Sequence, residues 1–303
     1  MKSKLLVIAG ITVGLCILTC SYVFGQDKVG AAEWTQIVEK IGDKGKINWS
    51  EGYIEAVGIG APPERFYGKA QARPMALRAA TLDAYRNLLE ATKGVRVDST
   101  TTVRDFAVES DVINSQVDGL VKGAKEVHKE YLSDGTVEVT IRMPLAGGFA
   151  QVIIPKPMQK KPADTPPPAA PAPATPAPAA PAPAVTAPAP VVYTGMVVDA
   201  RGLQARPAMA PKIIDENGKE VYGSMNVDRE YAVQQGVSGY ARDLTAAQSN
   251  ARVTNNPVSL KGLKTEGPGR SDIVISNADA ELIRSSEGNV AFLKKCRVMI
   301  VLD

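Results

Sequence analysis

Chemically reactive side chains are scarce in this chain of 303 residues. There is one histidine, His128, and two of the three cysteines, Cys16 and Cys20, lie in the N-terminal apolar segment. The remaining cysteine, Cys296, has no partner for an internal disulfide, and its place at the start of the largely apolar run 296–302 predicts a buried core residue. One histidine and one cysteine provide neither a metal-ligand cluster nor a Ser-His or Cys-His pair. We therefore predict a non-enzyme without catalytic residues, metal or cofactor.

Nucleotide-binding motifs and a strong net charge are missing as well. Ala61 and then two prolines follow Gly58–Gly60 and interrupt a dinucleotide-binding fingerprint, and Gly68–Ala70 lacks the other positions of a phosphate-binding loop. The formal net charge is +3, and it becomes +1 if Lys2 and Lys4 are removed with a signal peptide. A nearly neutral chain gives no electrostatic reason to expect nucleic-acid binding.

The N-terminus has the pattern of a secretory signal peptide. Two lysines precede the apolar stretch Leu5–Leu18, and the compact residues Val23 and Gly25 stand just before the expected cleavage site. We predict that residues 1–25 are removed on export to the periplasm or outer envelope. Two alternatives stay open, and both would associate the protein with a membrane. In the first alternative, the segment is retained as a membrane anchor. In the second, Cys20 is lipidated, although Thr19 before it is a poor match to a lipoprotein signal.

A tract of proline and alanine, residues 156–190, divides the rest of the chain. It contains thirteen of the 22 prolines. Proline removes backbone donors and alanine buries little surface, so this composition predicts a disordered linker rather than a packed domain. At about 3.1 Å per residue it would reach on the order of 100 Å. We expect a semi-rigid spacer that holds two modules apart, with a PxxP recognition ligand as the alternative.

Residues 26–155 predict a first α+β domain. Residues 74–92 form an amphipathic helix that begins with a proline and ends before a glycine, and its many alanines indicate close packing on a sheet. Strand patterns cover residues 47–58, 95–103, 120–132 and 136–143. Asp134 and Gly135 predict a hairpin between the last two strands. We expect helices on one face of a largely antiparallel sheet, with His128 at an exposed position.

Three stretches of this domain resemble the LPP20-type domain of bacterial envelope lipoproteins. They are residues 72–90 (ARPMALRAATLDAYRNLLE), 117–124 (VDGLVKGA) and 134–139 (DGTVEV). The domain is also similar to the N-terminal part of a flagellar-assembly protein of the periplasmic H-ring. The resemblance covers about residues 50–150 and implies a non-catalytic envelope protein, without catalytic residues to carry over. This chain departs from the family by lacking a good lipidation motif, which puts outer-membrane anchoring in doubt.

Residues 191–303 predict a second small α+β domain. Asn217 and Gly218 indicate a hairpin, Asp243 caps a helix, and Asn277 caps another helix that reaches about Ser285. Residues 292–302 predict a final, largely apolar strand that inserts into the sheet. The fold class is therefore α+β, with two small mixed domains joined by the Pro/Ala-rich linker.

Four arginines of the second domain are the candidate binding residues. With backbone groups near Gly202 and Gly239 they would form a small-anion site, whereas arginines on a surface are usually solvated. The candidates are Arg201, Arg206, Arg229 and Arg242.

Together these observations predict a secreted cell-envelope protein with a binding or scaffolding role in envelope or surface-appendage assembly. Its expected partners are envelope proteins or the cell wall. The alternative is a periplasmic module that binds or senses a small anion.

Overall fold

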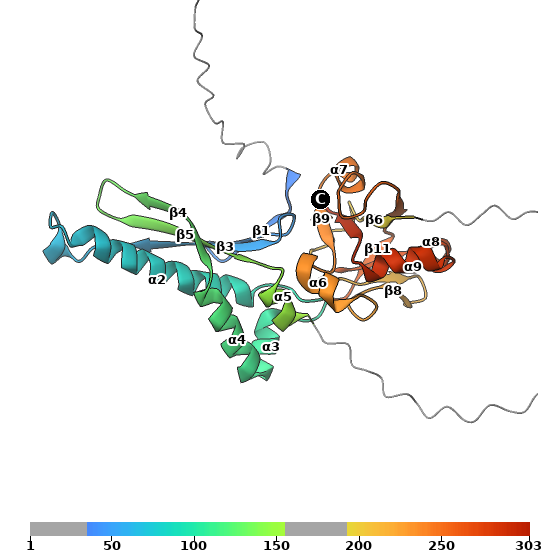
Figure 1. Ribbon diagram of the computed structural model, residues 1–303, viewed down its shortest axis with the longest axis horizontal. Coiled ribbons are helices and arrows are strands. Elements are labelled where there is room, and N and C mark those ends of the chain that lie inside the picture. The colour runs from blue at the N-terminus through green and yellow to red at the C-terminus, as the bar shows by residue number, and fades with distance from the viewer. Residues whose placement is uncertain (1–34, 155–192) are drawn as a thin grey trace, which may run out of the picture.

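The computed structural model describes residues 35–154 and 193–303, which form two modules that contact each other (Figure 1). We call residues 35–154 the N-terminal module and residues 193–303 the C-terminal module. The predicted signal peptide and the predicted linker lie outside the described residues. Both modules combine helices with sheets, which confirms the α+β fold class.

The N-terminal module is built on an antiparallel five-stranded sheet with the order β1-β2-β3-β5-β4. The central strands β3 and β5 pair along their whole length, from Tyr53 opposite Pro144 to Gly60 opposite Val137. Strand β4 forms an exposed edge that carries His128, and the predicted hairpin joins it to β5. The strand bounds are β1 Val38–Ile41, β2 Gly45–Asn48, β3 Tyr53–Gly60, β4 Lys125–Tyr131 and β5 Val137–Pro144.

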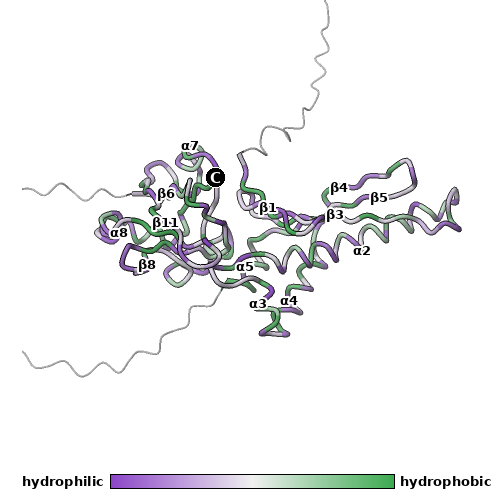
Figure 2. The backbone as a smooth tube through the Cα atoms, turned by 180° about the vertical axis from the view of Figure 1, so that it is seen from behind, coloured by the Kyte–Doolittle hydropathy of each residue, from purple (hydrophilic) through white to green (hydrophobic). Residues whose placement is uncertain are grey.

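Helix α2 (Ala72–Lys93) covers one face of this sheet, as predicted. The side chains that it buries are small, chiefly Ala76, Ala80 and Ala84, so its axis comes very close to β3. A Cβ atom added to Gly58 would lie 2.1 Å from the backbone nitrogen of Ala84, closer than any carbon can approach. Figure 2 shows hydrophobic and hydrophilic residues alternating along α2, as one buried face requires.

Three shorter helices complete the N-terminal module: α3 (Val103–Glu109), α4 (Asp111–Lys122) and α5 (Gly148–Ile153). The side chain of Ser110 caps α4 by accepting a hydrogen bond from the backbone N–H of Ile113. Because α4 extends to Lys122, the strand expected at 120–132 begins only at Lys125.

The strand predicted at residues 95–103 is wrong. This segment doubles back through a turn in which the Asp98 carboxylate accepts hydrogen bonds from the backbone N–H groups of Thr100 and Thr101. The two arms of the turn meet in a single bridge between Arg96 and Thr102.

The C-terminal module contains two four-stranded sheets. The first is parallel throughout with the order β10-β6-β13-β9, and the second is mixed with the order β11-β12-β7-β8. The predicted Asn217–Gly218 turn joins β7 to β8. The strands are β6 Gly195–Asp199, β7 Ile213–Asp215, β8 Glu220–Tyr222, β9 Gly239–Ala241, β10 Pro257–Lys261, β11 Lys264–Glu266, β12 Asp272–Ile275 and β13 Val298–Val301. The helices are α6 Arg229–Gln235, α7 Leu244–Gln248, α8 Asn277–Arg284 and α9 Glu287–Lys294.

The final strand β13 inserts between β6 and β9, which confirms its predicted central place. It is shorter than predicted, because residues up to Lys294 belong to α9. Cys296 follows the helix in a left-handed conformation, with φ of 54°, and its side chain is buried as predicted. The N-cap of α8 is Ser276 rather than Asn277, since the Ser276 side chain accepts a hydrogen bond from the backbone N–H of Asp279.

Buried side chains of the two modules form one contiguous hydrophobic cluster. The expectation that the linker holds the modules apart is therefore wrong for this structure.

Candidate functional site: the intermodule interface and the groove

The modules are joined first by main-chain hydrogen bonds. The segment after α2 lies beside residues 207–210, where the amide of Met209 donates to the Arg96 carbonyl at 3.0 Å. The amide of Ala210 donates to the Val97 carbonyl at 2.7 Å, and Arg96 Nε donates to the Pro207 carbonyl at 2.9 Å. This ladder fixes the register between the two modules.

Glu39 of β1 is the charged centre of the interface. Its carboxylate accepts hydrogen bonds from Arg96 of its own module, at 2.5 and 3.1 Å, and from Arg206 of the other module at 2.8 Å. The indole N–H of Trp49 also donates to it at 3.2 Å. Burial alone would raise the pKa of Glu39, but the hydrogen bonds and charge of Arg96, with the Arg206 and Trp49 bonds, lower that pKa below its usual value.

A second polar contact lies at Ser99, at the far end of the same segment. Its hydroxyl donates to the Asp272 carboxylate at 2.6 Å, and its carbonyl accepts from the amide of Gly269 at 2.6 Å. Gly267 has φ of +75°, and an added Cβ atom there would lie 2.5 Å from the Ser99 side chain. A glycine is therefore required where this loop meets Ser99.

An aromatic contact connects these polar groups to the core. The rings of Trp49 and Tyr240 meet edge to face, with centroids 5.9 Å apart. The Tyr240 hydroxyl donates to the Ala208 carbonyl at 2.7 Å and accepts from the Ala208 amide at 2.9 Å. Burial raises the pKa of Tyr240 to about 12, so this hydroxyl keeps its donor proton at physiological pH.

Three of the four candidate arginines bind the N-terminal module. Arg206 pairs with Glu39, Arg242 donates to the Gln36 carbonyl at 3.0 Å, and Arg229 donates to the carbonyls of Gln151 and Ile154. The fourth, Arg201, pairs with Asp199 of its own module at 2.7 Å.

These four side chains therefore meet carboxylates and backbone carbonyls at separate points. An anion would compete with those groups. The anion site remains a prediction, and the contacts explain the positions of these arginines without it.

Sequence reasoning missed the partners on the N-terminal side. Glu39, Arg96 and Ser99 have ordinary neighbours in the sequence, and their partners lie more than a hundred residues away along the chain. The one available signal was the number of arginines in the loops of the C-terminal module.

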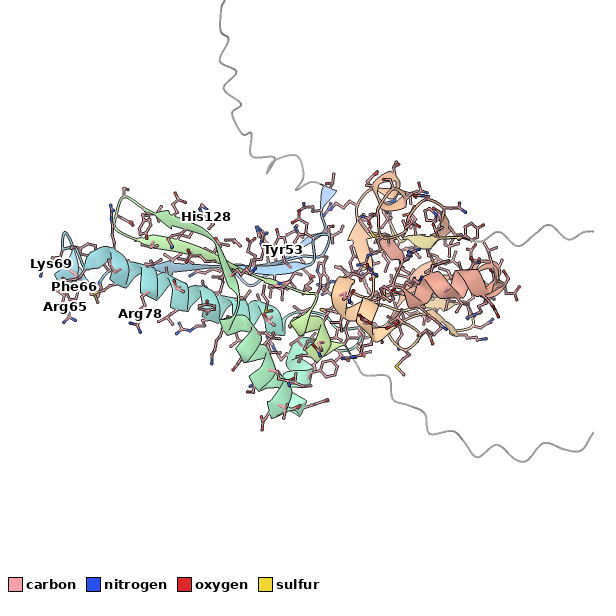
Figure 3. The ribbon with its side chains drawn as sticks, viewed as in Figure 1. Tyr53, Arg65, Phe66, Lys69, Arg78 and His128 are labelled. Carbon is pink, nitrogen blue, oxygen red and sulfur yellow. The ribbon has the colours of Figure 1, made fainter. Side chains whose placement is uncertain are left out.

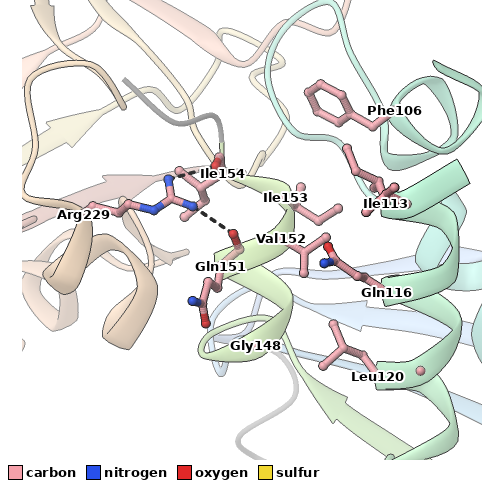
Figure 4. A pocket seen from close by; sticks show the side chains of 12 residues that line it. Phe106, Ile113, Gln116, Leu120, Gly148, Gln151, Val152, Ile153, Ile154 and Arg229 are labelled. Atoms are coloured by element: carbon pink, nitrogen blue, oxygen red, sulfur yellow. Dashed lines mark hydrogen bonds between the residues drawn. The ribbon is translucent and has the colours of Figure 1, made fainter. Parts of the chain in front are cut away.

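An apolar groove opens in the N-terminal module beside this interface (Figure 4). Its volume is about 830 Å³, and helices α3, α4 and α5 form its walls. Arg229 closes one end by donating to the Gln151 carbonyl at 2.8 Å and the Ile154 carbonyl at 3.1 Å. Its main apolar lining residues are Phe106, Val112, Ile113, Leu120, Val152 and Ile154.

Val112 stands at the lip of the groove as an exposed lining residue, with 66% of its side chain exposed. It follows the turn between α3 and α4, where the side chain of Val108 is 81% exposed. Such exposure is unusual for valine. Glu109 and Asp111 lie between the two valines in the sequence and are also exposed. The turn before the lip therefore carries both an apolar side chain and negative charge.

The described residues include no group of three or more His, Cys, Asp and Glu side chains arranged to hold a metal ion. His128 is exposed and lies 3.8 Å from Glu130, which is also exposed. Burial raises the pKa of the Cys296 thiol to about 11, which keeps it protonated and a poor nucleophile.

Comparison with known proteins places a family match on the C-terminal module. Residues 195–303 match the family described as Treponema pallidum Tp0624, second domain. No curated protein matches the chain. The helices within residues 35–154 and 193–303 are all too short or too polar to cross a bilayer.

Proposed function

We propose that this protein is an exported, non-catalytic adaptor of the cell envelope, and that its groove binds a protein partner. The groove carries this proposal, because it is open and apolar and has the exposed Val112 at its lip. The signal-peptide pattern of residues 1–25 supports export. The resemblance of residues 50–150 to LPP20-type domains supports an envelope role for the module that contains the groove.

The expected ligand is an amphipathic helix with basic flanking residues. Helical walls and an apolar floor suit a helix that buries one apolar face. The volume is in the range of protein pockets that bury most of a ligand. Glu109 and Asp111, in the turn that precedes Val112, favour positive charge near that face.

The interface gives this adaptor a defined geometry. Arg229 closes the groove from the C-terminal module, so the groove is complete only while the modules are docked. A partner bound there would therefore be held at a fixed position relative to both modules.

Cross-linking in envelope extracts tests the groove. Residues 26–303 would be the bait, beside a variant with Val112→Asp at the lip. Leu263→Asp is the matched control, since Leu263 is an exposed apolar residue of the C-terminal module. We expect the same partner with the wild type and the control, and its loss with Val112→Asp.

A partner retained by Val112→Asp would contradict the role of the groove. A thermal shift with phosphate or sulfate and no cross-linked partner would favour the anion-binding alternative instead. Fractionation of cells into cytoplasm, periplasm and membranes tests export, and a cytoplasmic protein with an intact N-terminus would exclude it.

A further inference from the structure

The outer face of α2 combines free cations with exposed apolar side chains. We define this outer face as Met75, Arg78, Leu82 and Arg86, which follow one another at intervals of three or four residues and so share one side of the helix. The opposite side carries the alanines that pack on the sheet. Leu82 is 61% exposed, and Met75 is 36% exposed. No described element covers this part of the helix.

The two arginines of this face have no partner within the described residues. The neighbouring carboxylate of Asp83 is already occupied, because it accepts from Lys44 at 3.0 Å and from the Ile59 amide at 3.0 Å. Arg78 and Arg86 are therefore exposed cations without an ion pair among the described residues, and the nearest exposed carboxylate along the helix, Glu90, lies one turn beyond Arg86. Most other arginines of this protein, by contrast, bind carboxylates, carbonyls or aromatic rings.

The loop before α2 extends this surface to the tip of the module. Arg65 and Lys69 lie over the ring of Phe66, 4.9 and 5.7 Å from its centroid. The neighbouring Tyr67 is 52% exposed. Figure 3 shows Arg65 and Arg78 on the same side of the module, and His128 beyond the sheet on the other side.

We propose that the outer face of α2 and this tip dock on an anionic lipid surface. Apolar and aromatic side chains that stand beside lysine and arginine suit the boundary between headgroups and acyl chains. The unpaired cations favour anionic headgroups over neutral ones. This proposal rests on the proposed envelope location but not on the groove, which lies on other helices.

Vesicle sedimentation tests the proposal with residues 26–303, which retain every described residue and lack the apolar N-terminal segment. We expect binding to vesicles of phosphatidylglycerol and phosphatidylcholine, little binding to phosphatidylcholine alone, and weaker binding at high salt. The double variant Arg78→Glu and Arg86→Glu should lose binding by roughly tenfold or more. Leu82→Gln should also weaken binding, and this effect should persist at high salt, where the charges contribute least.

The matched control is Lys219→Glu with Lys261→Glu, which makes the same charge change on exposed residues of the C-terminal module. Circular dichroism would verify that each variant is folded. Equal binding by the Arg78/Arg86 variant and the control, or no preference for anionic vesicles, would overturn the proposal. Val112→Asp should leave vesicle binding unchanged, so failure here and failure of the groove can be told apart.

Discussion

At the scale of single residues, Glu39 connects more of the interface than any other side chain described above. It accepts from two arginines that belong to different modules, and from Trp49, whose ring packs on Tyr240. Removing its charge would leave Arg96, itself 8% exposed, with a buried and partly unpaired guanidinium.

We therefore expect Glu39→Gln to lower the free energy of unfolding by about 2 kcal/mol, since a hydrogen bond to a charged group contributes about 1.5–3 kcal/mol. Urea denaturation at neutral pH measures this loss. Glu90→Gln is the control, because Glu90 is exposed on α2, and it should change stability by less than about 0.5 kcal/mol. Equal effects of the two variants would show that Glu39 has no special role.

The pH dependence of stability follows from the same carboxylate. The pKa of Glu39 is lower in the folded protein than in the unfolded chain, so its stabilising effect is complete above the unfolded pKa. That effect is lost as the pH falls through the folded pKa. The difference in unfolding free energy between the wild type and Glu39→Gln should therefore be constant near neutral pH and shrink toward zero in acid. A difference independent of pH would contradict this assignment.

At the scale of elements, the sequence correctly predicted the helix and the hairpin turns whose local pattern agrees with their packing. The alanines of α2, the Asp134–Gly135 hairpin and the Asn217–Gly218 hairpin are of this kind. The errors occur where composition allows two structures. The segment at 95–103 is rich in β-branched residues, but the Asp98 carboxylate turns it back on itself. The run at 292–302 is largely apolar although Lys294, Lys295 and Arg297 interrupt it, and such a run does not by itself distinguish the end of a helix from a strand.

The close approach of α2 to β3 provides a prediction at this scale. Gly58→Ala would place a carbon 2.1 Å from the α2 backbone, so the helix and the strand must separate. We expect a loss of about 3 kcal/mol in the free energy of unfolding, at the upper end for overpacked cores.

Gly119→Ala is the matched control for this substitution. Gly119 lies in the interior of α4 with open space around its Cα, so alanine should stabilise the helix by about 0.5–1 kcal/mol. Thermal denaturation of both variants measures the contrast. Similar melting temperatures for the two would show that α2 and β3 are less tightly packed than described.

At the scale of the whole molecule, the interface changes the role that we expect for the linker. Composition alone indicated a spacer that sets the distance between two binding surfaces. In the structure that distance is set by direct contacts at Glu39, Arg96 and Ser99, together with the shared hydrophobic cluster. No spacing along the sequence could reveal these contacts, because each depends on two modules folding before they meet.

The last prediction follows from this arrangement. A protease site introduced into the linker would allow it to be cut after purification, which removes the effective concentration that a covalent connection provides. Because the interface combines main-chain hydrogen bonds, charged pairs and apolar burial, we expect the two halves to co-elute in size-exclusion chromatography at micromolar concentration. Glu39→Gln should shift the cut protein toward separate halves, whereas Glu90→Gln should not. Wild-type halves that separate on cutting would show that the linker, rather than the interface, keeps the modules together.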